Sequence, residues 1–259
     1  MCDQNTKFLS EIYFIYDLNF KPTKQEIHQE DCPDYFLLNF TDETKSPVWE
    51  KYDFYIIAMQ YSPNVCILQG TKCLDILKTK ENYKIGIHGL WPSYTNGNIP
   101  QQCNLGEDIQ INVTSNKEYF DNYVLKNWYS LYKTDDYFLT HEYNTHGFCY
   151  NKFINESVDN FYIYLNKTLE IFNHYNFSIM FDNITRNLEP GEYLINKSVL
   201  IKNLEERYLH NSFVFTCFTF NNRLYLNEIY FKLNKNFGLM DGANLIDSCN
   251  GEEIWLNVI

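Results

Sequence analysis

The sequence predicts one α+β domain in which a central antiparallel β-sheet is flanked by helices and stapled by disulfides. Three observations indicate this class. Stretches with the apolar patterns of β-strands form two groups, stretches with helical periodicity lie between them, and eight cysteines are dispersed along the 259 residues. Because strands and helices do not alternate regularly, the order of the elements favours an α+β fold.

Two strands open the patterned part of the chain. The segment YDFYIIAMQY, residues 52–61, is almost continuously apolar and predicts a buried strand that ends at the turn residues 62–64. The segment KIGIHGLW, residues 84–91, predicts a second strand, which we expect to stop at Pro92 and the turn-rich sequence after it.

Three helices are predicted between the two strand groups. Residues 116–133 have apolar side chains near a 3.6-residue spacing and a capping residue at Ser115 or Asn116. Residues 157–172 repeat this pattern, and residues 198–210 begin with Ser198 as a cap. The expected buried faces of the first two helices contain Tyr119, Phe120, Tyr123, Val124, Asn127 and Leu131, and Val158, Phe161, Leu165, Leu169 and Phe172.

The second strand group predicts an antiparallel hairpin. The segments FVFTCFTF, residues 213–220, and RLYLNEIYFKLN, residues 223–234, both alternate in polarity, and Asn221 and Asn222 separate them as turn residues. No internal repeat or low-complexity linker interrupts the chain, so we place one domain at residues 49–259.

The charge of the chain limits its partners. The formal net charge is −12 at pH 7, a field that does not attract a polyanion such as a nucleic acid. Any nucleic-acid chemistry must therefore be local, or take place where carboxylates are partly protonated. No run of about 18 apolar residues occurs, so we expect no membrane span.

The cysteines and glycosylation motifs favour an oxidising compartment. No C-x-x-C pair occurs, so the cysteines indicate disulfides rather than zinc ligands, with on the order of a hundred possible pairings. Residues 1–48 are a polar leader of unknown role without a clear signal peptide, and we expect a removed signal or a misassigned start. We expect a secreted, endolysosomal or vacuolar glycoprotein, with N-x-S/T sequons at Asn39, Asn112, Asn155, Asn166, Asn176, Asn183 and Asn196.

Two histidine segments carry the candidate chemistry. HEYNTHGFC, residues 141–149, is close to the zinc protease motif H-E-x-x-H but has one residue more between its histidines. That residue breaks the spacing that places two zinc ligands on one α-helical face, and no third ligand motif is visible. We therefore expect no metal and no cofactor. The other segment is IGIHGLWP, residues 85–92.

Together the two segments resemble the motifs of the ribonuclease T2 family. The family motif H-G-L-W-P is intact at residues 88–92, and H-E-W-x-K-H-G-T-C is kept at His141, Glu142, His146, Gly147 and Cys149. The order of the motifs and their separation also fit, and AMQYSP, residues 58–63, is similar to the family's L-Q-W-P strand end. The resemblance covers about residues 50 to 250.

This resemblance implies a monomeric endoribonuclease that cleaves single-stranded RNA without metal, through 2′,3′-cyclic phosphates. RNA supplies the 2′-hydroxyl nucleophile, and two imidazoles in opposite protonation states can act as base and acid. By resemblance His146 is the base and His88 the acid, while His141 holds the phosphate and Glu142 orients the cluster. The residues implied in substrate binding are Gln60, Trp91, Phe138 and Tyr143.

The resemblance also implies the disulfides. Two of them are Cys66–Cys73 and Cys217–Cys249, and a third, Cys103–Cys149, ties the second motif to the loop after the first. Cys2 and Cys32 lie outside the resemblance, and their pairing with each other follows only by elimination.

Three positions depart from the family pattern. Thr145 replaces the lysine before the last motif histidine, and the loss of one such transition-state donor costs on the order of 3 kcal/mol in comparable sites unless Lys152 or another cation substitutes. Phe148 replaces a threonine, and Ser93 stands where some members have a base-contacting aspartate, so the base preference stays open. Thr145 also supports the alternative function, a weak or inactive ribonuclease-like secreted glycoprotein with an RNA-binding or signalling role.

Overall fold

Six β-strands form one sheet in the computed structural model, which describes residues 52–259 except 81–83, 97, 99, 101–102, 104–107, 158 and 243–244. The order across the sheet is β2-β1-β5-β6-β3, and β4 pairs with β5 beside this path. The strands are β1 (Phe54–Tyr61), β2 (Ile85–Ser93), β3 (Gly191–Asn196), β4 (Phe213–Phe220), β5 (Arg223–Leu233) and β6 (Glu253–Val258). All pairs are antiparallel except a short parallel contact between β5 and β6.

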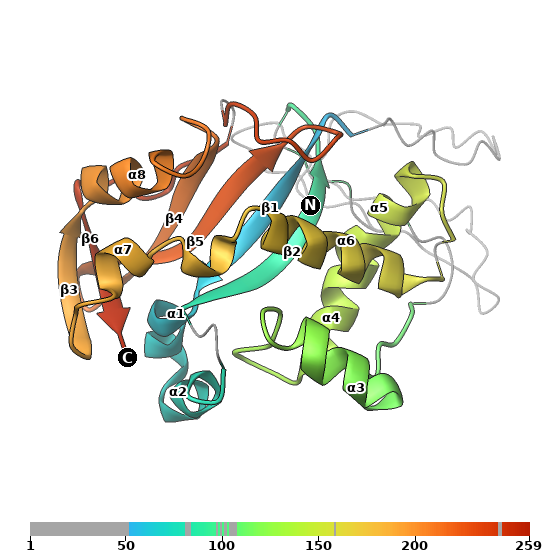
Figure 1. The fold of residues 1–259 in the computed structure, drawn as a ribbon, viewed down its shortest axis with the longest axis horizontal. Helices are drawn as coiled ribbons and strands as arrows, with labels where there is room; N and C mark the ends of the chain where they lie inside the picture. The colour runs from blue at the N-terminus through green and yellow to red at the C-terminus, as the bar shows by residue number, and fades with distance from the viewer. Residues whose placement is uncertain are drawn as a thin grey trace, which may run out of the picture. The chain divides into compact units, whose positions relative to one another are not determined.

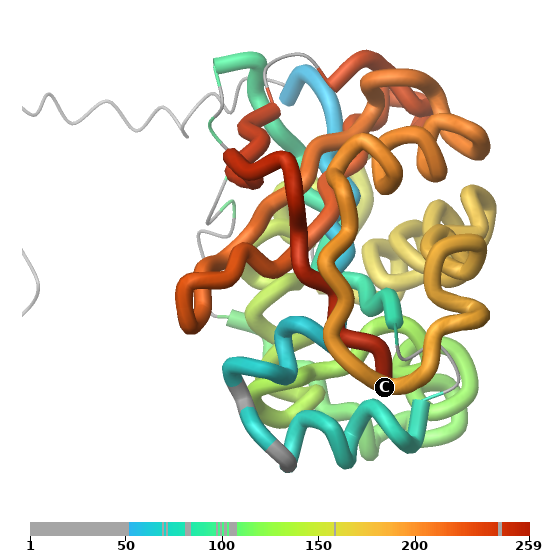
Figure 2. The backbone as a smooth tube through the Cα atoms, turned by 90° about the vertical axis from the view of Figure 1, so that its left-hand side faces the viewer, coloured from blue at the N-terminus to red at the C-terminus, as the bar shows by residue number. Residues whose placement is uncertain are grey.

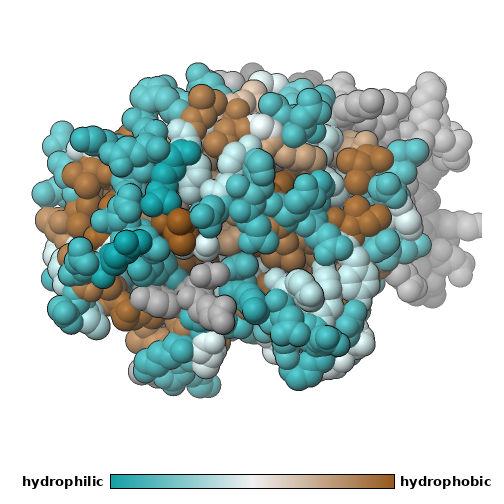
Figure 3. Space-filling view, in the orientation of Figure 1, coloured by the Kyte–Doolittle hydropathy of each residue, from teal (hydrophilic) through white to brown (hydrophobic). Residues whose placement is uncertain are grey.

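Helices cover one face of the sheet. Figure 1 shows α6 crossing in front of β1 and β2, with α8 on the same side near β4, and Figure 2 confirms that both lie on one side of the sheet. The outward surface of this layer is mostly hydrophilic, with separate hydrophobic groups between (Figure 3). The helices are α1 (Ser62–Gln69), α2 (Thr71–Leu77), α3 (Lys117–Tyr119), α4 (Asp135–Glu142), α5 (Phe148–Phe153), α6 (Phe161–His174), α7 (Asp182–Thr185) and α8 (Lys197–Glu205).

The side chains on the two faces of β1 pack into different hydrophobic clusters, because side chains alternate along a strand. Tyr55, Ile57 and Met59 point into the main hydrophobic core under the helices. Ile56 and Ala58 point to the other face and belong to a smaller cluster that includes Trp91 of β2. The second face therefore carries a smaller hydrophobic cluster, and polar groups of the neighbouring strands gather on it.

The structure confirms the predicted α+β class and most of the predicted strands. β1 and the β4–β5 hairpin lie within the expected segments, β2 starts within its expected segment, and Asn221 and Asn222 have φ of 49° and 60°. Two left-handed residues in a row are the geometry of the tight hairpin turn that suits strand twist. β2 does not stop at Pro92, which pairs with Tyr55. Because β2 is an edge strand, the missing N–H of Pro92 breaks no ladder.

The helix predicted for residues 116–133 is too long. Helical turns extend only from Val113 to Val124, through η1 (Val113–Asn116), α3 and η2 (Phe120–Val124). The chain then leaves the helix and lies along the free edge of β2, where Ile87 N–H donates to the Asn127 carbonyl at 2.7 Å. Pairing with the sheet edge outweighs the helical periodicity. Asn116 is a cap as expected, since its side chain accepts from Tyr119 N–H.

The other two predicted helices differ at their starts. The second begins at Phe161 rather than residue 157, and its buried face includes Leu165, Leu169 and Phe172 as expected, while residue 158 lies outside the described residues. The third is capped by Asn196 and not by Ser198, because the Asn196 side chain accepts from the N–H and the hydroxyl of Ser198.

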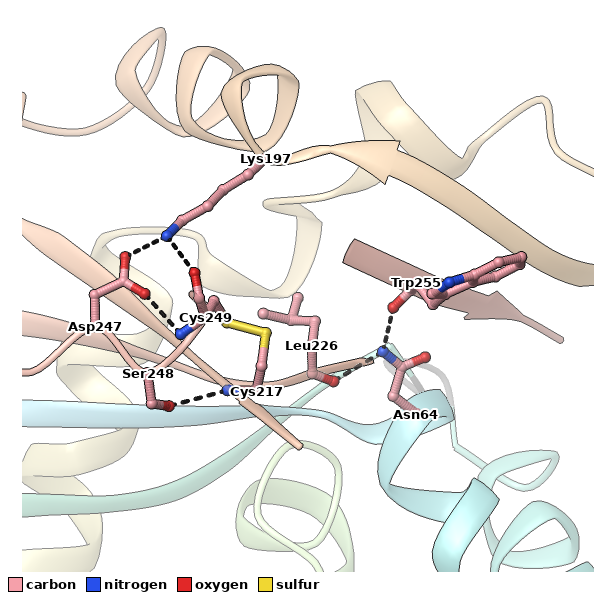
Figure 4. Close-up of a disulfide and its surroundings, with 8 residues drawn as sticks. All are labelled: Asn64, Lys197, Cys217, Leu226, Asp247, Ser248, Cys249 and Trp255. Carbon is pink, nitrogen blue, oxygen red and sulfur yellow. Dashed lines mark hydrogen bonds and ion pairs between the residues drawn. A yellow bond between two sulfur atoms is a disulfide. The ribbon is translucent and has the colours of Figure 1, made fainter. Parts of the chain in front are cut away.

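Three disulfides staple the part of the chain that the structure describes, as the resemblance implies. Cys66–Cys73 joins α1 to α2, Cys103–Cys149 holds α5, and Cys217–Cys249 ties β4 to the segment before β6 (Figure 4). Cys2, Cys32 and the expected leader lie outside the described residues. Among the described residues, no helix is long and apolar enough to cross a membrane.

Buried Asn64 joins β5 to β6 where the two strands share little direct pairing. Its side-chain amide donates to the carbonyls of Leu226 and Trp255, both at 2.8 Å (Figure 4). Its side-chain oxygen accepts from Asn257 N–H at 2.7 Å. The strands themselves pair only at Tyr225 and Trp255. One fully buried side chain therefore replaces several ladder hydrogen bonds at this junction.

We expect Asn64→Ala to destabilise the domain by on the order of 3 kcal/mol, because it strands two carbonyls and one N–H away from their partners. Urea unfolding monitored by circular dichroism measures this loss. Asn173→Ala, at an exposed position of α6, is the control and should change the unfolding free energy by less than about 0.5 kcal/mol. Equal effects of the two substitutions would contradict the role of Asn64.

Candidate active site

His88 lies on the face of β2 opposite the main core, on the edge strand of the sheet. Ile87 before it points into the main core, so alternation turns His88 to the other side. The Trp128 indole N–H donates to the His88 carbonyl at 3.0 Å, and its ring is fully buried. Strand β2, which carries the first histidine motif, is therefore held in place by Trp128, which lies in the segment that follows η2.

The second motif lies on one continuous helix with a wide turn in its middle. α4, the π-helical turn η3 (Tyr143–Gly147) and α5 follow one another without a break, and Phe148 N–H donates to the Tyr143 carbonyl five residues back. Such a turn accommodates one residue more than an α-turn and occurs often at functional sites. The additional residue between His141 and His146, which breaks the zinc spacing, is accommodated here.

Buried Glu142 connects the two motifs. One oxygen lies 3.3 Å from His88 Nε2, and the other accepts from the Trp91 indole N–H at 3.1 Å. The Trp91 ring lies between the two imidazoles, with centroids 5.1 Å from His88 and 5.2 Å from His146. Glu142 is 1% exposed and His146 is 7% exposed, so both act in a medium where charges interact strongly.

A second carboxylate on β5, Glu228, contacts His88, and the sequence reasoning missed it. Glu228 Oε1 contacts His88 Nδ1, and its other oxygen accepts from the Tyr230 hydroxyl at 2.7 Å. The predicted strand already held a signal for this contact. Glu228 lies two residues before Tyr230, so the two side chains share one face of the strand. What the sequence could not supply was the strand order, which brings β5 near β2 across β1.

These contacts separate the protonation of the two histidines. Burial lowers the pKa of His88, but the carboxylates of Glu142 and Glu228 outweigh it and raise that pKa well above the usual value. Burial lowers the pKa of His146 to about 4, against the opposing pull of Glu142. Although burial raises the pKa of Glu142, its contacts with His88 outweigh that effect and keep the pKa below its usual value. At mild pH His88 is therefore charged and His146 neutral.

A pocket of about 330 Å³ opens beside His88. Its lining includes His141, Glu228 and two of the expected substrate-binding residues, Gln60 and Phe138. Gln60 is 5% exposed, and its buried amide nitrogen has no hydrogen-bond partner among the described residues. The remaining lining residues are His88, Ser130, Leu131, Tyr132, Lys133, Tyr137 and Asn227.

Two of the expected substrate-binding residues do not line this pocket. Trp91 lies between the histidines, as described above. Tyr143 is fully buried in the main core, and its hydroxyl accepts from the Asn151 side chain at 3.0 Å. Tyr143 therefore anchors the motif helix instead of facing a ligand.

The position that lacks the family lysine opens onto a neighbouring pocket of about 620 Å³. Thr145 lines this pocket together with Asp108, Asp136 and His141, and His141 is common to both pockets. Lys133, not Lys152, is the lysine among the described residues that line the two pockets, and its ammonium lies 3.7 Å from the ring centre of Tyr137. In the described part of the chain, no group of three or more acidic, histidine or cysteine side chains is arranged to hold a metal ion.

Comparisons with known proteins define the class. The sequence profile of the ribonuclease T2 family matches residues 52–247, and the chain belongs to this family. Ribonuclease DdI of Dictyostelium discoideum is 26% identical over 152 residues, which are 59% of this chain and 62% of that protein. Ribonuclease 1 of Arabidopsis thaliana is 28% identical over 41% of this chain and 46% of its own length. The chain thus matches less than two thirds of the length of these relatives.

Solved structures support the fold. The crystal structure of RNase NT in complex with 5′-AMP superposes with a TM-score of 0.59 at 21% identity, covering 79% of this chain and 98% of that one. Ribonuclease MC1 from the seeds of bitter gourd superposes with a TM-score of 0.58 at 18% identity, covering 78% and 99%. At these identities the agreement shows the fold.

Gly89 must be glycine for the Glu142 bridge to form. A Cβ atom at this position would overlap the Glu142 carboxylate and the Trp91 indole nitrogen. We expect Gly89→Ala to destabilise the domain by about 1–3 kcal/mol, as overpacking of a buried site does. At Gly86 of the same strand a Cβ would lie 3.2 Å from the ends of the Gln60 and Ser62 side chains. Gly86→Ala should therefore cost less, and thermal unfolding compares the two; an equal or smaller loss for Gly89→Ala would contradict this reading.

Proposed function

We propose that the chain is an endoribonuclease that cleaves single-stranded RNA by transphosphorylation through a 2′,3′-cyclic phosphate, without a metal. One observation carries this proposal: buried Glu142 pairs with His88 and also acts electrostatically on His146, and the pKa values of these two imidazoles are moved in opposite directions. A pair of groups with separated pKa values is the arrangement that acid–base catalysis requires. The relatives named above are ribonucleases, and RNase NT was solved with a nucleotide.

In the first step His146 acts as the base. Neutral His146 takes the proton of the 2′-hydroxyl, whose oxygen attacks the adjacent phosphorus, and charged His88 gives a proton to the departing 5′-oxygen. The products are a 5′-hydroxyl and a 2′,3′-cyclic phosphate, with His146 charged and His88 neutral. Water can then open the cyclic phosphate with the two roles reversed, which returns both histidines to their first states.

The phosphate needs hydrogen-bond donors, and the site has fewer than the family pattern. His141 is exposed at the junction of the two pockets, where it can hold the phosphate, and Lys133 adds a positive charge at the rim. Thr145 cannot replace a lysine as a donor of charge to the phosphorane. We therefore expect a slower enzyme than a member with the complete motif. The adjacency of His88, Glu142 and His146 favours this active enzyme over the inactive glycoprotein alternative.

The expected compartment follows from the same chemistry. Three disulfides persist in oxidising compartments, so we propose a secreted, endolysosomal or vacuolar protein. The sequon residues Asn112, Asn155, Asn166, Asn176, Asn183 and Asn196 are exposed and accessible to glycosylation, while Asn39 lies outside the described residues. The RNA substrate and a monomeric state belong to this proposal.

Each catalytic histidine carries one proton transfer, so His88→Ala and His146→Ala should each lower the rate of RNA cleavage by at least about a hundredfold. The measurement is initial cleavage of a short RNA, with analysis of cyclic phosphate ends. His174→Ala, an exposed residue of α6, should be near neutral. Loss of wild-type activity in chelator, restored by zinc or magnesium, would overturn the metal-free mechanism.

The pH dependence should be bell-shaped and broad. His146 must be neutral to act as base, so activity should fall as the pH decreases through about 4. His88 must be charged to act as acid, and its pKa is raised, so activity should fall only as the pH rises well above the usual histidine range. Cleavage rates from pH 3 to pH 9 at fixed ionic strength measure both limbs. A narrow optimum with an alkaline limb below pH 6 would disagree with this assignment.

A further inference from the structure

We propose that Glu228 is a positioning residue for the proton donor: it holds the Nδ1–H of His88 so that the Nε2–H is the proton delivered to the leaving oxygen. This inference rests on the proposed function, since it assigns a role within that reaction. It concerns a residue outside both histidine motifs, on a strand that neither motif reaches.

The sheet explains how Glu228 reaches His88. The two residues lie on β5 and β2, with β1 between them, and Glu228 pairs with Gln60 of β1. The residue of β1 that faces the same side one step earlier is Ala58, which pairs with Gly89. A methyl group and a glycine leave room above β1, so the carboxylate and the imidazole can meet across the intervening strand.

Glu228 and Glu142 differ in what they can do for His88. Glu142 divides its two oxygens between His88 Nε2 and the Trp91 indole, and it also acts on His146. Glu228 makes the closer contact with His88, through Nδ1, and its second oxygen is occupied by the Tyr230 hydroxyl. The Tyr230 contact fixes the carboxylate, and the carboxylate fixes the ring, as an acidic partner orients a catalytic imidazole.

Other titratable groups surround His88. Glu142 and His141 face it from α4, His146 from η3, and Tyr132 and Lys133 line its pocket from the preceding loop. Of these, only Glu142 is a second carboxylate. Removal of the Glu228 charge therefore leaves His88 with one anionic partner in place of two, and the effect should be visible in the titration of His88 itself.

The proton balance follows from this geometry. Charged His88 holds two N–H groups: Nδ1–H is directed at Glu228, while Nε2, which lies 3.3 Å from a Glu142 oxygen, carries the proton to be transferred. When the 5′-oxygen leaves, the Nε2–H bond breaks and an O–H bond forms, while Nδ1–H stays with Glu228. His88 is then neutral with its free electron pair on Nε2, in the tautomer needed to take a proton from water in the second step.

Glu228→Gln tests the role of the charge, because its amide oxygen can still accept from Nδ1–H. We expect the alkaline limb of the RNA cleavage profile to move down by about one pH unit or more, with the acid limb unchanged. Glu228→Ala also removes the anchor, so kcat should fall about tenfold or more at every pH with little change in KM. Glu192→Gln is the matched control: Glu192 also accepts from a tyrosine hydroxyl on a strand, but its described partners are Tyr225 and Arg223.

A second readout separates this inference from the proposed function. Titration of the histidine ring protons by NMR, with His88 assigned by its absence in His88→Ala, should show the His88 pKa falling in Glu228→Gln and not in Glu192→Gln. If the wild type cleaves no RNA but this shift occurs, the proposed function fails and the pairing stands. The inference is overturned if the alkaline limb of Glu228→Gln is the same as that of the wild type. It is also overturned if His88 of the wild type titrates at an ordinary histidine pKa, and this measurement does not depend on the folding of a variant.

Discussion

The site depends on the burial of one charge. The Glu142 carboxylate is almost completely removed from water, and an isolated ion there would cost several kcal/mol. Its partners, the His88 imidazole and the Trp91 indole, come from β2, so the charge is tolerated only when the helix and the strand are brought together correctly. Three features allow the helix and the strand to come together in this way. Gly89 has no side chain to clash with Glu142, the π-turn at Tyr143–Gly147 accommodates the extra motif residue, and the Asn127 carbonyl accepts from Ile87 N–H at the edge of β2.

The two histidines illustrate how burial and charge compete. His146 is buried and His88 is partly buried, and this loss of water disfavours the charged imidazole in each case. Two carboxylates reverse this effect at His88, while a single, shared carboxylate does not reverse it at His146. Glu142 and Glu228 together raise the pKa of His88, whereas at His146 the neighbouring imidazoles of His88 and His141 add to the lowering effect of burial. A strongly acidic chain thus creates a cation where the proposed reaction needs a proton.

The sequence predicted much of the fold, because its strands and its second helix obey simple periods. The hairpin followed from alternation and from Asn221 and Asn222, and the three described disulfides followed from the family resemblance. Periodicity failed between residues 125 and 133, where a sheet edge competes for the backbone. The short strands β3 and β6 were not predicted, since a buried Asn64 supports one of them through contacts far apart in sequence. Contacts between residues far apart in sequence also explain two differences at the site: the contact of Glu228 with His88 was not predicted, and Tyr143, which was expected at the pocket, is buried.

The wide turn at Tyr143–Gly147 makes the motif sensitive to length as well as to composition. Each residue of an α-helix turns the chain by about 100°, so residues five apart would diverge by about 140° in a regular helix. The π-turn absorbs part of that rotation. A deletion of one residue inside the turn, at Asn144 or Thr145, would close it to an ordinary α-turn, so the side chains that follow, to Phe153, would keep their directions. The two histidines would then lie four residues apart, which is the spacing of the zinc motif H-E-x-x-H. One residue of length therefore separates this motif from a metal-binding spacing, and homologous sequences should be aligned over it without gaps.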